Sequence, residues 1–228
     1  MKKLLLMSTV AAIALASAAQ AQVAFEKGTV SLNFGIISDA DITLVDAESA
    51  LAFSTGNLGF QIDGAINMIT DFSNFDSFGS YGLHFYKPTA NGNKYGAYVS
   101  ASYFLTQVGA EAMVSVGALD IEGSIGILSA DFGPDNIYNA TIDLYYTVNE
   151  NIEVSAGYNL YFDDANSEGI FRIGGSYMLP NSDLAINAGY RDQFESSIID
   201  IGVTWSFGGN QDMRLFGDRT SDLFFGPV

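Results

Sequence analysis

The sequence contains no cysteine, which excludes both a disulfide framework and a thiolate metal site. Beyond its first 21 residues it also has no run of about 18 consecutive apolar residues, which excludes a membrane-spanning helix. Charged residues make up only 15% of the chain, and basic ones are scarce, with 9 Lys and Arg against 26 Asp and Glu. The formal net charge of −17 argues against binding to nucleic acid or to anionic surfaces. Stability must therefore come from backbone pairing and burial.

The N-terminal region has the pattern of a secretory signal peptide. Lys2 and Lys3 precede an apolar run at residues 4–16, and small residues follow at Ala19 and Ala21. We expect residues 1–21 to be removed, so that a chain of about 207 residues begins at Gln22. The sequence therefore predicts an exported protein. Removal of Lys2 and Lys3 with the signal peptide makes its net charge still more negative.

The remaining chain is too apolar to be disordered, since 48% of all residues are hydrophobic and Gly, Tyr and Phe number 24, 12 and 17. Apolar and polar residues alternate with period two in twelve runs, which indicates strands. The runs are 28–37, 44–54, 58–69, 78–87, 94–105, 108–116, 119–130, 137–147, 152–162, 169–178, 183–192 and 196–207. The sequence therefore predicts an all-β fold.

The links between these runs alternate in character. Short turn signals occur at residues 54–57, 90–93, 117–120, 148–151 and 180–183. Acidic and often longer links occur between them at residues 38–41, 71–78, 131–136, 163–169 and 192–196, with an ambiguous link at 106–109. Alternating tight and acidic links predict an up-and-down antiparallel meander, with all tight turns at one end.

Aromatic residues on the apolar faces distinguish a transmembrane β-barrel from a soluble β-sandwich or lectin. They fall into two bands, one near the tight turns and one near the acidic links, with smaller apolar residues between. The first band contains Phe53, Phe60, Phe85, Tyr95, Tyr146, Tyr177, Trp205 and Phe207; the second contains Tyr81, Tyr103, Tyr138, Phe162, Phe171 and Tyr190. A soluble core gives no reason for such banding, so we expect a transmembrane barrel of about 12 strands over residues 22–207.

The last run, "DIGVTWSF", resembles the terminal-strand signal of Gram-negative outer-membrane barrels. Asp200, Gly202, Trp205 and Phe207 stand at its polar, glycine and two aromatic positions. Over residues 22–207 the chain also resembles the small porin-like barrels of these bacteria. The resemblance implies an integral outer-membrane protein that contacts lipid and the barrel assembly machinery and has both termini in the periplasm.

The resemblance leaves residues 208–228 as a periplasmic C-terminal tail, which many members of the family lack. A disordered terminus is one interpretation of the tail. The other is that it folds back across the periplasmic mouth, sets Arg214 and Arg219 against carboxylates such as Asp46, Asp120 or Glu153, and so narrows or gates the channel.

The polar faces of the strands are expected to line the lumen, and most of their charges are acidic. The candidate lining residues are Asp46, Glu48, Asp63, His84, Glu111, Asp120, Glu122, Asp143, Glu153, Arg172, Arg191 and Asp200. An acidic lumen attracts cations and repels anions. The two arginines are expected to pair with carboxylates such as Asp143 or Glu153 and to form a constriction.

Three classes of function are compatible with this pattern. The first is a passive channel for small hydrophilic solutes that prefers cations; the second is a non-conducting structural or surface-interaction barrel. The third is an outer-membrane hydrolase, for which His84 shows no serine and carboxylate partners at a recognisable spacing. We expect a channel, with no catalytic residues, cofactor or metal site, and a homo-oligomer is compatible with it. The acidic residues at 163–169 lack the spacing of a calcium loop.

Overall fold

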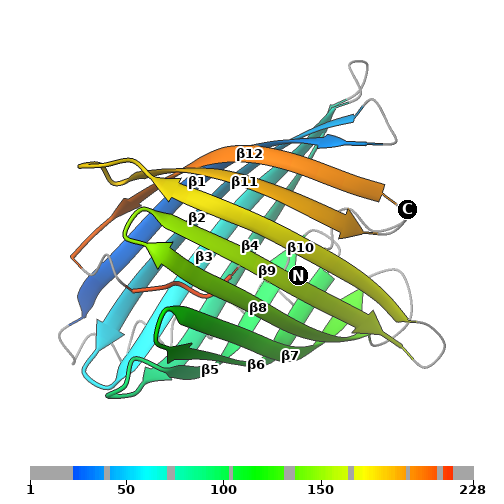
Figure 1. Cartoon of the computed structure of the whole chain (residues 1–228). Coiled ribbons are helices and arrows are strands. Elements are labelled where there is room, and N and C mark those ends of the chain that lie inside the picture. Colours follow the sequence, from blue (N-terminus) through cyan, green and yellow to red (C-terminus); the bar gives the residue numbers. More distant parts are fainter. Residues whose placement is uncertain are drawn as a thin grey trace.

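In a computed structural model, the chain forms a closed barrel of twelve antiparallel strands (Figure 1). The structure describes residues 23–38, 42–70, 75–102, 105–130, 137–163, 167–193, 196–209 and 213–217, so the expected signal peptide lies outside them. The strands are β1 (Ala24–Ile37), β2 (Ile42–Thr55), β3 (Leu58–Thr70), β4 (Phe75–Pro88), β5 (Lys94–Ser102), β6 (Leu105–Val116), β7 (Leu119–Ala130), β8 (Ile137–Asn149), β9 (Ile152–Phe162), β10 (Ser167–Met178), β11 (Leu184–Gln193) and β12 (Ser196–Phe207). The part of the chain that the structure describes has no helix long and apolar enough to cross a membrane.

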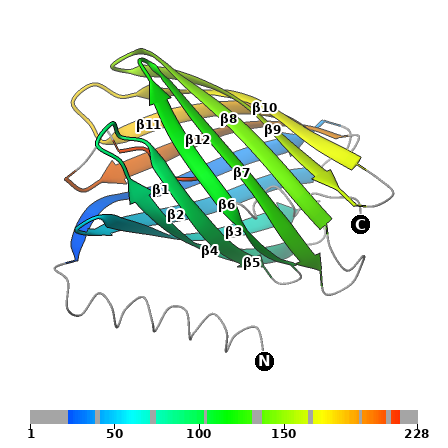
Figure 2. The same ribbon diagram turned by 90° about the horizontal axis from the view of Figure 1, so that it is seen from below.

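Each strand pairs with its sequence neighbours, and the first and last strands close the barrel. The closing register runs from Gly28 opposite Phe207 to Ile37 opposite Ile198. Closure leaves no free sheet edge, which a barrel surrounded by hydrocarbon requires. The strands slant across the barrel in two perpendicular views (Figures 1 and 2).

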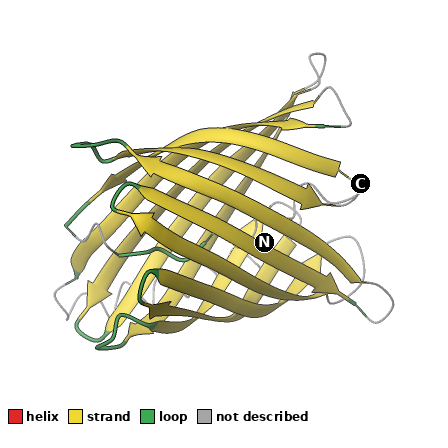
Figure 3. Ribbon diagram, viewed as in Figure 1, coloured by secondary structure: helices red, strands yellow, loops and turns green. Residues whose placement is uncertain are grey.

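All five tight turns lie at one end of the barrel (Figure 3). Four of them contain a residue in the left-handed conformation, which glycine and asparagine adopt most readily. These residues are Gly56, Gly92, Gly117 and Asn181, with φ of 59°, 83°, 63° and 57°. The sequence prediction of alternating links and of a meander is confirmed.

Several predicted boundaries differ from those of the structure. The ambiguous link at 106–109 lies within β6, and the expected strand at 94–105 ends at Ser102 as β5. The acidic stretch at 163–169 is shorter as a link than expected, because Ser167 to Gly169 belong to β10. β1 begins at Ala24, earlier than expected, and contains a bulge between Phe25 and Lys27.

The outer surface of the barrel is apolar. Leu32, Ile66 and Val154 are 43%, 54% and 45% exposed, as the predicted parity requires. Aromatic rings line the rim at the tight turns, where Phe25, Phe53 and Phe60 contact in sequence with centroid separations of 5.6 and 5.1 Å. At the opposite rim, the rings of Tyr138 and Phe162 are 5.6 Å apart. Tyr103 lies outside the described residues.

Candidate functional site

The interior of the barrel holds a segment of the C-terminal tail. The chain turns at Gly208, whose φ is 115°, and residues 213–217, here called the tail segment, lie inside the barrel, drawn in red in Figure 1. Phe216 is only 3% exposed and packs against Tyr86 and Met113. The tail segment therefore folds back into the barrel and packs against its wall. Arg219 lies outside the described residues.

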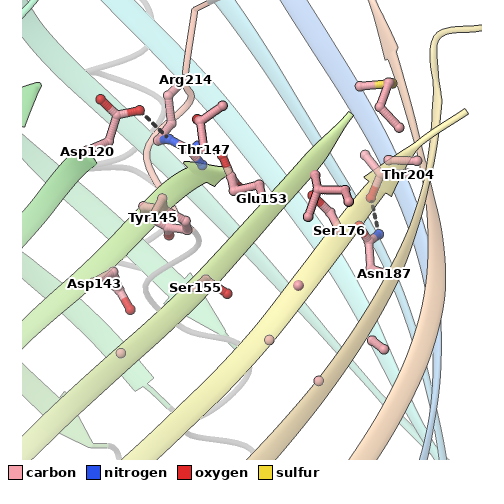
Figure 4. A pocket seen from close by; sticks show the side chains of 18 of the residues that line it. Asp120, Asp143, Tyr145, Thr147, Glu153, Ser155, Ser176, Asn187, Thr204 and Arg214 are labelled. Atoms are coloured by element: carbon pink, nitrogen blue, oxygen red, sulfur yellow. Dashed lines mark hydrogen bonds and ion pairs between the residues drawn. The ribbon is translucent and has the colours of Figure 1, made fainter. Parts of the chain in front are cut away.

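Arg214 of the tail segment is held by two carboxylates. Its Nε donates to Asp120 Oδ2 at 3.1 Å, and its Nη2 pairs with Glu153 (Figure 4). The guanidinium carbon lies 4.0 Å from the ring centroid of Tyr145, a cation–π contact. Burial lowers the pKa of Arg214, but Glu153 and Asp120 outweigh it and raise the pKa, so the side chain stays charged. Of the three expected partners, Asp120 and Glu153 bind Arg214, and Asp46 is not among its contacts.

Main-chain groups of the tail segment are bound by side chains of the barrel wall. The amide of Gln61 meets both main-chain groups of Phe216: Phe216 N donates to Gln61 Oε1 at 2.9 Å, and Gln61 Nε2 donates to Phe216 O at 2.7 Å. Gly217 N donates to Glu122 Oε1 at 3.1 Å, and Lys94 Nζ donates to the carbonyl of Arg214. Gln61 and Lys94 were not singled out from the sequence, since neither carries a recognisable motif.

His84 lies between two carboxylates at the centre of this side of the lumen. Its Nδ1 is 2.9 Å from Glu111 Oε1, and its Nε2 is 2.6 Å from Asp63 Oδ2. Two hydrogen bonds to carboxylates need a donor on each nitrogen, which only the imidazolium provides. The ring also stacks on Phe216, with centroids 5.7 Å apart and an interplanar angle of 1°. His84 thus has the carboxylate neighbours that the sequence did not reveal.

The opposite side of the interior contains an open cavity of about 780 Å³. Its walls come from β1, β7 to β12 and the tail segment. Six of the expected lining residues line it: Asp120, Asp143, Glu153, Arg172, Arg191 and Asp200. Lys27 adds a positive charge that the sequence analysis did not place there, and Arg214 adds the charge that one interpretation of the tail set against Asp120 and Glu153.

The two strand arginines are balanced by carboxylates. Arg172 Nη2 donates to Asp143 Oδ1 at 2.8 Å, while the other expected partner, Glu153, binds Arg214 instead. Arg191 is paired with Arg172 in the register of β10 and β11. It also interacts electrostatically with three carboxylates, those of Asp46, Glu48 and Asp200. The cavity is therefore lined by compensated charges rather than by a free acidic surface.

The interior is not polar throughout. Towards the end opposite the tight turns, apolar side chains of inward parity are buried inside the barrel, with exposures of 0 to 6%. They are Leu44, Leu128, Tyr161, Ile170 and Ile198. The expectation of a polar lumen is wrong in this layer, because the side chains fill the barrel instead of lining water there.

Among the residues that the structure describes, no group of three or more His, Asp or Glu side chains is arranged to hold a metal ion. Asp63 and Glu111 converge on the imidazole of His84 instead. The acidic stretch at 163–169 falls partly on residues 164–166, outside the description.

No family model and no curated protein matches the sequence. Solved structures resemble the fold. The NanC porin covers 77% of this chain and 98% of its own, with a TM-score of 0.59 and 11% identity. The KdgM porin, in complex with disordered oligogalacturonate, covers 78% and 99%, with a TM-score of 0.58 and 9% identity. The chain thus has the barrel fold of outer-membrane porins.

The outer-membrane phospholipase A from Escherichia coli is also similar, with a TM-score of 0.56, 11% identity and coverage of 80% and 90%. Sharing this fold does not assign an activity. In the present chain both ring nitrogens of His84 are bound to carboxylates. Neither is left to accept a proton from a serine hydroxyl, which serine-dependent hydrolysis requires.

Proposed function

We propose that this protein is an outer-membrane channel for the passive diffusion of small hydrophilic solutes. The observation that carries the proposal is the open cavity of about 780 Å³ inside a closed barrel with an apolar outer surface. Two rims of aromatic side chains on that surface match the two water interfaces of a bilayer. The tight turns and the end of β12 would face the periplasm, and the acidic links the outside of the cell.

The solute pathway follows β8 to β12, because the tail segment and the His84 cluster fill the other side. Arg214 and Leu215 of the tail segment form part of the cavity wall and narrow the cavity, so the width that remains favours small solutes. The apolar layer at the far end favours the alternative of a non-conducting barrel, and conductance measurements decide between the two.

A weak preference for cations follows from the interior charges. The nine inward carboxylates and Glu150 at the cavity face five basic side chains, namely Lys27, Lys94, Arg172, Arg191 and Arg214, together with the imidazolium of His84. The excess is acidic, but it is smaller than the strand residues alone predicted. Because the arginines are compensated by carboxylates, the cavity does not favour a polyanion of the kind bound by the KdgM porin.

The proposal is tested in planar lipid bilayers with the refolded full-length protein. We expect discrete conductance steps and, under a KCl gradient, a reversal potential that indicates K⁺ preference at low salt and falls as ionic strength rises. Heat-denatured protein is the control. Absence of conductance from protein shown to be folded favours the structural barrel, and selectivity for chloride contradicts the charge assignment.

A further inference from the structure

The tail segment is bound inside the barrel as a peptide ligand is bound by a receptor. We propose that the wall formed by β3 to β9 is a specific binding site for a short peptide with Arg and Phe two residues apart and Gly following. The tail segment occupies this site as a tethered ligand and restricts the open cavity. The restriction rests on the proposed channel function, whereas the binding site does not.

Recognition of the peptide main chain is the first part of the argument. Gln61 binds both main-chain groups of Phe216, at 2.7 and 2.9 Å, in the manner of a pairing strand. Lys94 and Glu122 bind the neighbouring groups of Arg214 and Gly217. Gln61 and Glu122 are both 0% exposed, so these polar side chains are buried and directed at the segment.

Two side-chain pockets supply the sequence specificity. Phe216 enters an aromatic pocket, stacked on His84 and edge-on to Tyr86 with a centroid separation of 5.5 Å. Arg214 enters an acidic pocket closed by the face of Tyr145. The site is therefore expected to select peptides that have a positively charged side chain at one position and an aromatic ring two residues later.

The segment is separable from the barrel, as a ligand must be. All hydrogen bonds described between it and the wall involve wall side chains, so the strand ladders do not depend on it. Closure is completed by β1 and β12 before the chain turns at Gly208. Leu215 faces the open cavity, on the side away from the aromatic pocket.

Binding is tested in trans with a barrel truncated after Gly209 and a capped synthetic peptide of residues 213–217. Isothermal titration calorimetry is expected to show one peptide per barrel. A peptide of identical composition with Arg and Phe exchanged should bind at least 10-fold more weakly. Gln61→Leu in the barrel should weaken binding similarly, whereas Asn187→Ala on the opposite wall should not.

Equal binding of the two peptides, or no binding to a truncated barrel shown by heat-modifiable migration to be folded, overturns the site. Full-length protein gives an independent measurement through trypsin cleavage after Arg214. The exchange variant (Arg214→Phe with Phe216→Arg) is not suitable for this measurement, because its arginine and therefore its cleavage site lie two residues further along the chain. Gln61→Leu leaves the cleavage site at Arg214 and is used instead. We expect cleavage at Arg214 at least 10-fold faster in Gln61→Leu than in the native chain or Asn187→Ala, and equal rates contradict the proposal.

Restriction of the cavity is tested by conductance. The truncated barrel and the full-length exchange variant, which keeps the length and charge of the tail, should both conduct more than the native protein. Added peptide should reduce the conductance of the truncated barrel from the tight-turn side. Specific peptide binding without any change in conductance refutes the restriction and the assigned pathway, while the binding site stands.

Discussion

Replacement of His84 by leucine should reveal how strongly the interior depends on one buried cation. The imidazolium of His84 is fully buried between Asp63 and Glu111, which are 5% and 4% exposed. Leucine has a similar volume and keeps an apolar contact with Phe216, so the packing changes little. The main loss is the positive charge and both hydrogen bonds.

The expected destabilisation is about 3–5 kcal/mol at neutral pH, the usual cost of leaving buried charge without its partner. Only one compensating contact stays for Asp63, the hydrogen bond from Gln61 Nε2 at 2.8 Å. A triple variant, His84→Leu with Asp63→Asn and Glu111→Gln, also removes the two carboxylate charges. It should lose only about 1–2 kcal/mol, the cost of poorly satisfied neutral groups. The charged single variant should therefore be less stable than the triple variant by about 1–4 kcal/mol.

Reversible urea unfolding in detergent micelles measures this difference. Trp205, the one tryptophan of the sequence, lies on the outer surface and reports loss of the apolar surroundings by its fluorescence. Equal stability of the single and triple variants at neutral pH would refute the view that charge compensation holds this cluster together.

Three further outcomes follow from the structure. Replacing Arg172 and Arg191 together by alanine should increase the K⁺ preference in a KCl gradient at low salt, and an unchanged reversal potential contradicts their place on the solute pathway. Gly202→Val should lower the urea midpoint by an amount equivalent to about 1–3 kcal/mol, because the side chain and main chain of β1 occupy the space of a Cβ; an unchanged midpoint contradicts this close packing. Replacing Trp205 and Phe207 by serine should reduce the folded barrel in the outer membrane far more than replacing their two inward neighbours, and equal amounts by heat-modifiable migration contradict the assembly role.

The strands and their faces could be predicted because hydrocarbon and water demand opposite surfaces from alternate residues. The prediction that Leu32 and Ile66, among others, point to the outer surface of the barrel is correct. The failure at 106–109 has a specific cause. The ambiguous link at 106–109 ends on Gly109, a residue type common in turns, whereas here its missing Cβ leaves room in β6 for the ring of Tyr98. Glycine marks a close approach as readily as a turn, and the sequence alone does not distinguish them.

The candidate site was less predictable because its contacts cross strands whose register the sequence does not fix. His84 meets Asp63 and Glu111 from 21 and 27 positions away. The sequence predicted a longer link, at 71–78, than the one between Thr70 and Phe75, and a shift of one pair would have moved Asp63 out of reach. The alternation of side chains along each strand assigned all three residues to the interior. Only the pairing register between the strands brings their side chains into contact. The depth of the tail segment had no signal beyond its apolar and basic composition.

The position of the open cavity follows from the sizes of the inward side chains. Eight-stranded barrels are filled by their own side chains, and sixteen strands leave an aqueous channel, so a barrel of twelve strands lies between. Here one wall carries bulky inward residues such as Tyr86 and Met113, which enclose Phe216. The other wall carries Gly174 and Gly189, and both face the cavity. The interior is therefore divided between a filled side that binds the tail segment and an open side, and the width of that open side depends on whether the segment remains bound.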